Sequence, residues 1–108
     1  MNIIESSKFK KSYKKIIIGK HLEKEKENLN KILIIIQNTS NLQNLMNSKY
    51  QQRYHIRQKE GNLKEYISAS LSQRVRLILK PIASLPYNYL EIEDIEFVEI
   101  NDEHYKNM

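Results

Sequence analysis

The sequence predicts an α+β fold in which an N-terminal helical hairpin packs on a twisted, mainly antiparallel sheet of four to five strands. Two periodicities carry this prediction. Apolar residues alternate with polar ones from residue 63 to residue 80, which is the period of strands. Between residues 8 and 38 they recur every three or four residues, which is the period of helices. With 108 residues, the chain is expected to be a single domain, 1–108, with one modest core.

The stretch from Gly61 to Lys80 predicts a β-hairpin. A three-residue loop at 72–74 places these apolar pairs on one face: Leu71 with Val75, Ala69 with Leu77 and Ile67 with Leu79. The polar residues then share the opposite face: Tyr66, Ser70, Arg76 and Lys80. A solvated face is the ordinary interpretation of such residues, but cations beside hydroxyls also suit a phosphate backbone.

Two helices are predicted before the hairpin. Ser6 or Ser7 is expected to cap the first, which begins at Lys8 and stops at Gly19. The second runs from residue 21 to residue 38 and carries this apolar stripe: Leu22, Leu29, Ile32, Leu33 and Ile36. Short strands are expected at 2–5, on a sheet edge, and at 95–100.

Residues 50–58 are predicted to form a further strand, because Tyr54 and Ile56 alternate with basic residues. The basic residues face the other way: Arg53, His55, Arg57 and Lys59. Two neighbouring strands with cations on one face favour a nucleic-acid ligand.

The net charge of +5 is unevenly distributed along the chain. Residues 1–90 hold 17 of the 18 lysine and arginine residues, whereas residues 91–108 hold seven of the 13 acids. A basic body indicates a polyanionic partner, although ordinary basicity is the alternative. The chain has no apolar run long enough to span a membrane and no apolar region at its N-terminus, so we expect a cytoplasmic protein.

Signature motifs of several enzyme classes are missing, among them the P-loop, GxGxxG, HExxH and GxSxG. The chain has three scattered histidines and no cysteine, so we expect neither a metal site nor a cofactor. Its arginine, lysine, histidine and tyrosine side chains suit metal-free cleavage of RNA. In that reaction the ribose 2′-OH attacks, a base deprotonates it, and cations stabilise the charged phosphorane.

The motif G-x-L-K-x-x-x-S, followed after seven residues by R-L, runs without a gap from Gly61 to Leu77. It resembles the central hairpin of the RelE/ParE toxin superfamily of type II toxin–antitoxin systems, and above all its HigB-like, plasmid-maintenance branch. The chain end, with His104 and Tyr105, is similar to the tail of that branch. Length and element order agree over nearly the whole chain.

The resemblance implies a RelE-like fold and a ribosome-dependent, metal-independent endoribonuclease, an mRNA interferase. Such toxins inhibit translation by cleaving messenger RNA in the ribosomal A site through 2′-OH attack. It implies this catalytic set: Arg76, Lys80, Asp102, His104 and Tyr105. The remaining strand and loop cations are expected to bind RNA: Arg53, Arg57, Lys59, Lys64 and Arg74. Either Arg57 or Lys59 closes the preceding strand in this comparison.

The implied partners are the ribosome with its messenger RNA, and a cognate antitoxin, expected to be a helix-turn-helix protein similar to HigA. DNA would be contacted only indirectly, through the antitoxin. Two alternatives remain open: a ParE-like toxin that inhibits DNA gyrase, and a non-enzymatic RNA-binding module. Arg76 and Lys80, together with His104 and Tyr105, favour the nuclease, since ParE-like chains generally lack that set.

Overall fold

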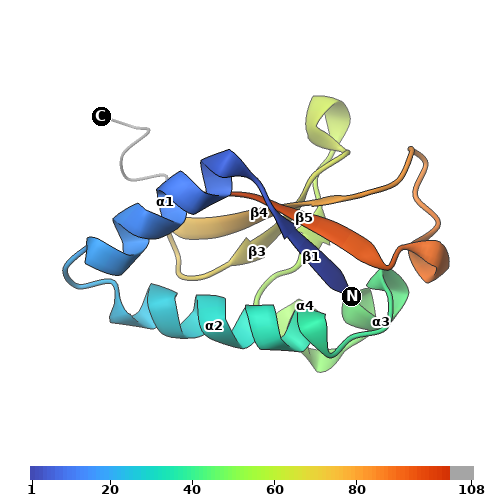
Figure 1. Ribbon diagram of the computed structural model, residues 1–108. Helices are drawn as coiled ribbons and strands as arrows, with labels where there is room; N and C mark the ends of the chain where they lie inside the picture. Colours follow the sequence, from blue (N-terminus) through green and yellow to red (C-terminus); the bar gives the residue numbers. More distant parts are fainter. Residues whose placement is uncertain (103–108) are drawn as a thin grey trace.

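The computed structural model describes residues 1–102, and Figure 1 shows helices gathered around one sheet. The elements follow in this order: β1 (Asn2–Glu5), α1 (Ser7–Ile18), α2 (Glu23–Gln37), α3 (Leu42–Met46), α4 (Lys49–Arg53), β2 (Arg57–Gln58), β3 (Ile67–Ser70), β4 (Val75–Pro81) and β5 (Asp94–Asp102). Short 3₁₀ helices lie at Gly61–Leu63 and Tyr89–Glu91. No helix within residues 1–102 is both long and apolar enough to cross a membrane.

The five strands form one sheet in the order β1-β5-β4-β3-β2. β1 runs parallel to β5, and the other neighbouring strands are antiparallel. Where β1 ends, α1 continues along the edge of β5. There the Ser6 hydroxyl donates to the Val98 carbonyl at 2.6 Å, and the Ser12 hydroxyl accepts from the Ile100 amide at 3.0 Å. The predicted α+β fold, with helices on a mainly antiparallel sheet, is confirmed.

The predicted hairpin register is confirmed. Ile67 lies opposite Leu79 and Ala69 opposite Leu77 in β3 and β4, and the Leu71 amide donates to the Val75 carbonyl at 2.9 Å. The prediction was wrong about where the strand begins. Leu63 belongs to a 3₁₀ helix and is half exposed, and the chain turns through Gly61 at a φ of 64°, which glycine adopts without strain.

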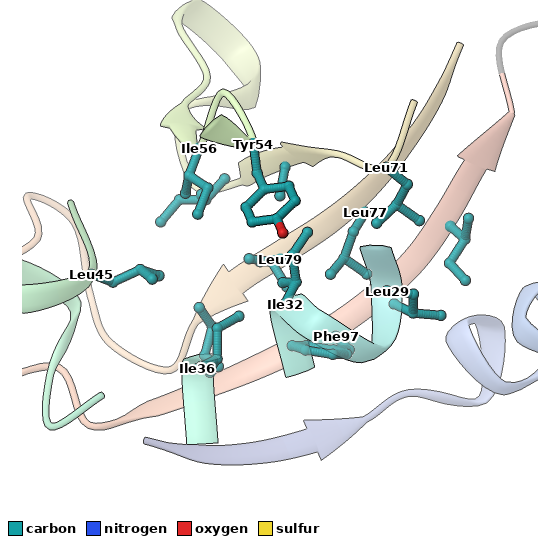
Figure 2. Packing of buried hydrophobic residues seen from close by; sticks show 14 of the residues in the cluster. Leu29, Ile32, Ile36, Leu45, Tyr54, Ile56, Leu71, Leu77, Leu79 and Phe97 are labelled. Carbon is teal, nitrogen blue, oxygen red and sulfur yellow. The ribbon is translucent and has the colours of Figure 1, made fainter. Parts of the chain in front are cut away.

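The core lies between α2 and one face of the sheet, here called the core face (Figure 2). Buried side chains of α2 (Leu29, Ile32 and Ile36) meet buried side chains of the strands (Leu77, Leu79 and Phe97). From α1, Phe9 packs edge-on against Phe97 with ring centroids 5.3 Å apart. Ser6 caps α1 as expected, accepting from the Phe9 amide at 2.9 Å. Leu33, predicted to be buried on the sheet, is only partly buried.

The strand predicted at 50–58 is wrong over most of its length. Residues 49–53 form helix α4, and only Arg57 and Gln58 pair with β3. Tyr54 and Ile56 are both buried, as alternation requires, and both side chains belong to the core (Figure 2). The residue between them, His55, has a φ of 50°, so the chain turns there and does not continue as a strand. A short alternating run fits a helix end followed by a turn as well as it fits a strand.

Candidate functional site

A cavity of about 770 Å³, here called the arginine cavity, opens beside β3 where the two-residue strand β2 begins. Its walls come from the N-terminal half of α2, from α4 and the turn after it, and from the β3–β4 hairpin. These residues line it: Lys24, Asn28, Lys31, Gln51, Arg53, Tyr54, His55, Arg57, Ser70, Leu71, Ser72, Gln73 and Arg76.

The charges that line this cavity suit a polyanion. It is lined by two lysines and three arginines, and no acidic residue is among its lining residues. The charge of Lys31 is paired with Glu27, which is not a lining residue: the Lys31 Nζ lies 2.9 Å from the Glu27 carboxylate. The hydrogen bond between them raises the pKa of Lys31. The arginines suit phosphate, since a guanidinium binds two phosphate oxygens at once and stays charged.

Arg76 is held in place by the strand opposite. It lies across from Ser70 in the β3–β4 register, so both side chains leave the sheet on the face away from α2. An Arg76 Nη1–H donates to the Ser70 hydroxyl at 2.7 Å, and both residues are half buried. Its neighbours Val75 and Leu77 are buried on the core face. The guanidinium therefore enters the cavity with much of its rotational freedom already removed.

His55 lines the same cavity from an unusual backbone position. The His55 amide donates to the Gln52 carbonyl at 3.4 Å and the Ile56 amide to the Gln51 carbonyl at 2.9 Å, the bonding pattern of a Schellman helix end. This pattern puts His55 in the left-handed region, with a φ of 50°, where glycine or asparagine is usual. Its side chain is exposed between Arg53 and Arg57. Non-glycine residues in this conformation gather at functional sites.

From the sequence, His55 is predicted only as one residue of a basic stripe. The sequence does contain a pattern that indicates a helix before His55. Ser48 is a favourable N-cap, and Tyr50 and Tyr54 are four residues apart, as on one face of a helix. The structure brings Arg53, Arg57 and Arg76 together with His55, although Arg53 comes from a helix rather than from the predicted strand.

The other predicted site residues lie elsewhere. Lys80 shares the face of Arg76 but lies four residues along β4, with its Nζ 3.7 Å from the Glu65 carboxylate. Lys64 lines a second cavity with Tyr87 and Tyr89. These remaining described residues are outside the arginine cavity lining: Lys59, which follows β2, Arg74, which is exposed in the hairpin loop, and Asp102, which lines a cavity beside α1. His104 and Tyr105 lie outside the described residues.

Comparison with known proteins rests on structure alone, since no protein-family model matches the chain and no curated protein is significantly similar to it. YafQ from E. coli matches with a TM-score of 0.64 and 18% identity, over 97% of this chain and 96% of that one. A YoeB/ParE toxin from Agrobacterium tumefaciens matches with a TM-score of 0.64 and 11% identity, over 94% and 98%.

A third match is the heterotetrameric YoeB-YefM toxin-antitoxin complex from Staphylococcus aureus, with a TM-score of 0.60 and 17% identity, over 94% of each chain. The chain has the RelE/ParE toxin fold. At these identities the likeness establishes the fold. In this fold the arginine cavity lies beside β3, where β2 begins.

Proposed function

We propose that this chain is the toxin of a type II toxin–antitoxin system, of the HigB-like branch, acting in the cytoplasm as a ribosome-dependent, metal-independent endoribonuclease on messenger RNA. The observation that carries the proposal is the anchoring of Arg76 by Ser70 inside a cavity that three arginines line. A fixed guanidinium suits stabilisation of charge that develops during a reaction, because it needs little reorganisation at that moment.

The reaction proposed is attack of the ribose 2′-OH on the adjacent phosphate, with departure of the 5′-oxygen. Arg76 stabilises the negative charge of the phosphorane, while Arg53 and Arg57 hold neighbouring phosphates. His55 is placed among these cations to exchange a proton with the 2′-OH or the 5′-oxygen. A histidine suits this task because it titrates near neutrality.

Lys80 and the chain-end residues of the implied catalytic set also have proposed roles. Lys80 extends the cationic face beyond Arg76 and contacts the RNA backbone once it exchanges Glu65 for phosphate. His104 and Tyr105 serve proton transfer and base stacking, with Asp102 orienting the histidine. These last roles come from the resemblance of the chain end.

The test is single-turnover cleavage of a ribosome-bound message by the purified chain, with Arg76→Ala and Lys11→Ala compared. Lys11 is an exposed cation on α1, so its loss should leave cleavage unchanged. Inhibition of DNA gyrase without RNA cleavage would contradict the nuclease in favour of a ParE-like toxin. Message binding without cleavage would instead indicate an RNA-binding module.

The partner is tested separately, because a free nuclease of this kind would arrest its host. Co-expression with the protein encoded by the adjacent gene should restore growth, and the two proteins should purify together. We expect that partner to be an antitoxin of the helix-turn-helix, HigA-like type.

A further inference from the structure

The cavity that Lys64, Tyr87 and Tyr89 line, here called the tyrosine pocket, has a volume of about 800 Å³. It lies at the end of the sheet opposite the β3–β4 loop, between α3, β2 and the loop at residues 85–89. That loop leads to the 3₁₀ helix beside α3, at the right of Figure 1. There the Leu42 amide donates to the Ile92 carbonyl at 2.9 Å, so the segments around the pocket are joined by the backbone.

Both tyrosines of the pocket are held through their hydroxyls. The Tyr87 Oη–H donates to the Glu65 carbonyl at 2.7 Å. The Tyr89 Oη–H donates to the Gln58 Oε1, and the Gln58 Nε2 donates in turn to the Lys64 carbonyl at 2.6 Å. Both tyrosines are half buried, and this burial raises the pKa of each phenol, so both hydroxyls keep the proton that they donate. The rings are fixed before a ligand arrives, which lowers the entropy cost of stacking on them.

The other side chains of the pocket supply hydrogen-bonding groups and one positive charge. Gln43, on α3, is half buried, and within residues 1–102 its side-chain amide makes no hydrogen bond. Its donor and its acceptor are therefore both available to a ligand. Among the lining residues Lys64 is the one charged side chain, and it is exposed. An amide with both groups available matches the edge of a nucleobase, as glutamine and asparagine match adenine.

Fixed aromatic rings, an available amide and a lysine are the groups that recognise single-stranded RNA. Unpaired bases stack on aromatic side chains, polar side chains bond their edges, and cations meet the backbone phosphates. An acidic protein would meet a single cation in this pocket, Lys64, and a lipid chain would meet amides and a lysine. The lining therefore favours a base over either of these ligands.

The tyrosine pocket and the arginine cavity adjoin across β2. Arg57 lines the arginine cavity and Gln58 lines the tyrosine pocket, and successive residues of a strand point to opposite faces. Their Cα atoms are about 3.8 Å apart. β2 is the last strand in the sheet order and has two residues, so a single strand of RNA can pass over it. An RNA whose phosphate is held by Arg57 brings a nearby base to the pocket.

We propose that the tyrosine pocket binds one unstacked base of single-stranded RNA, close to the phosphates that the arginine cavity holds. The base stacks on the rings of Tyr87 and Tyr89, the Gln43 amide bonds its edge, and Lys64 meets the backbone. That this RNA is the cleaved message rests on the proposed function. The pocket then selects a base near the cleaved bond, whereas the arginines hold phosphates of any sequence.

The experiment measures the affinity of the full-length chain for a single-stranded RNA of about eight nucleotides, a length that single-strand binding sites cover. Its riboses carry 2′-O-methyl groups, so that no 2′-OH can attack a phosphate. The double variant Tyr87→Leu with Tyr89→Leu removes both rings and should weaken binding by about 5- to 150-fold. The double variant Tyr87→Phe with Tyr89→Phe keeps the rings and should bind within about 3-fold of the wild type.

The matched control is Tyr13→Leu, because Tyr13 is a half-buried tyrosine of α1 that does not line the pocket. Its affinity for the RNA should change less than about 3-fold. Lys64→Gln removes a phosphate contact, so the slope of log affinity against log salt concentration should fall by about 0.7. The leucine double variant should keep the wild-type slope, since stacking involves no counterion.

A cross-link on the unaltered chain tests the pocket even if the leucine variant fails to fold, which thermal melts detect. Thiouridine in the same RNA should cross-link, under near-ultraviolet light, to the peptide that holds residues 85–89. Equal affinity of the leucine double variant and Tyr13→Leu overturns the pocket proposal, as does a cross-link confined to other peptides. Cleavage of ribosome-bound message that still depends on Arg76 would then leave the nuclease proposal standing. Loss of both RNA binding and cleavage in the wild-type chain overturns both proposals.

Discussion

A hollow of about 660 Å³ between α1 and α2, here called the lysine groove, is lined by Lys10, Lys14, Ile17, Ile18 and Leu33 among others. The arginine cavity and the lysine groove are both basic, yet the side chains around their cations differ. In the cavity, arginines stand among hydroxyl, amide and imidazole groups, and Arg76 is anchored by a serine. In the groove, exposed lysines flank isoleucine, leucine and tyrosine side chains. Arginines in a polar cavity suit phosphate, whereas lysines beside open apolar surface suit an acidic protein. Net charge alone does not make this distinction.

Two histidines share a backbone conformation but differ in their surroundings. His21 and His55 have φ values of 65° and 50°, so both follow helices in the left-handed region. His21 lies in the turn between α1 and α2, and His55 lies between two arginines of the cavity. Strain by itself therefore does not indicate function, and the surrounding side chains decide which histidine is a candidate.

The largest effect is expected from removing a proton-transfer group. His55→Gln should lower the single-turnover cleavage rate by about 10²–10⁴ and remove one limb of the pH–rate profile. If the two histidines act as base and acid, His104→Ala should lower the cleavage rate by a similar factor and remove the other limb of the pH–rate profile. Cleavage of ribosome-bound message across pH distinguishes them. A wild-type rate and profile for His55→Gln would remove this histidine from the chemistry and leave His104 as the candidate.

A smaller loss is expected from Arg76. Arg76→Ala should lower the cleavage rate by about 10²–10³, because the charge developing on the phosphate loses its fixed guanidinium. Affinity for the ribosome should fall much less, since other cations share the phosphate contacts. The melting temperature should stay near the wild-type value, because Arg76 lies on the face away from α2. An equal fall in affinity and rate would show that Arg76 contributes to RNA binding and not to stabilisation of the developing charge.

The effect of Ser70 should be smaller again, because it acts through Arg76. Ser70→Ala removes the acceptor of the 2.7 Å bond and should lower kcat about 10-fold, with little change in KM. Ser70→Thr keeps the hydroxyl in a residue that suits a strand, and it should restore the rate. A purely structural role would instead lower the stability of Ser70→Ala and leave kcat unchanged in both variants.

The fold followed from the sequence where one periodicity was long. Strict alternation from Ile67 to Leu79 admits one register, because a slip by one residue moves every apolar side chain to the other face. The turn at His55 could not be found in this way, since the burial of Tyr54 and Ile56 fits both a strand and a helix end. The ion pair of Lys80 was equally hidden, because Glu65 lies in an irregular segment between the 3₁₀ helix and β3.

The smallest predicted effect is on stability, and it concerns the backbone strain at His21 and His55. Glycine adopts a positive φ freely, whereas other residues pay about 1–2 kcal/mol there, partly offset by the greater entropy of glycine in the unfolded chain. His21→Gly and His55→Gly should therefore each raise the free energy of unfolding by about 0.5–1 kcal/mol. This corresponds to a rise of about 2–8 °C in melting temperature. Both side chains are exposed, so little packing is lost in either variant.

The two variants should differ in activity. His21→Gly should cleave at the wild-type rate, because His21 lies in the turn that precedes α2 and not in the cavity. The His55→Gly variant should be more stable, because glycine relieves the backbone strain. It should also be less active, because the proposed proton-transfer side chain is gone. The measurements are thermal melts and single-turnover rates of both variants. If both are stabilised and both remain fully active, His55 is no more than a helix terminator, and the proton transfer must come from the chain end.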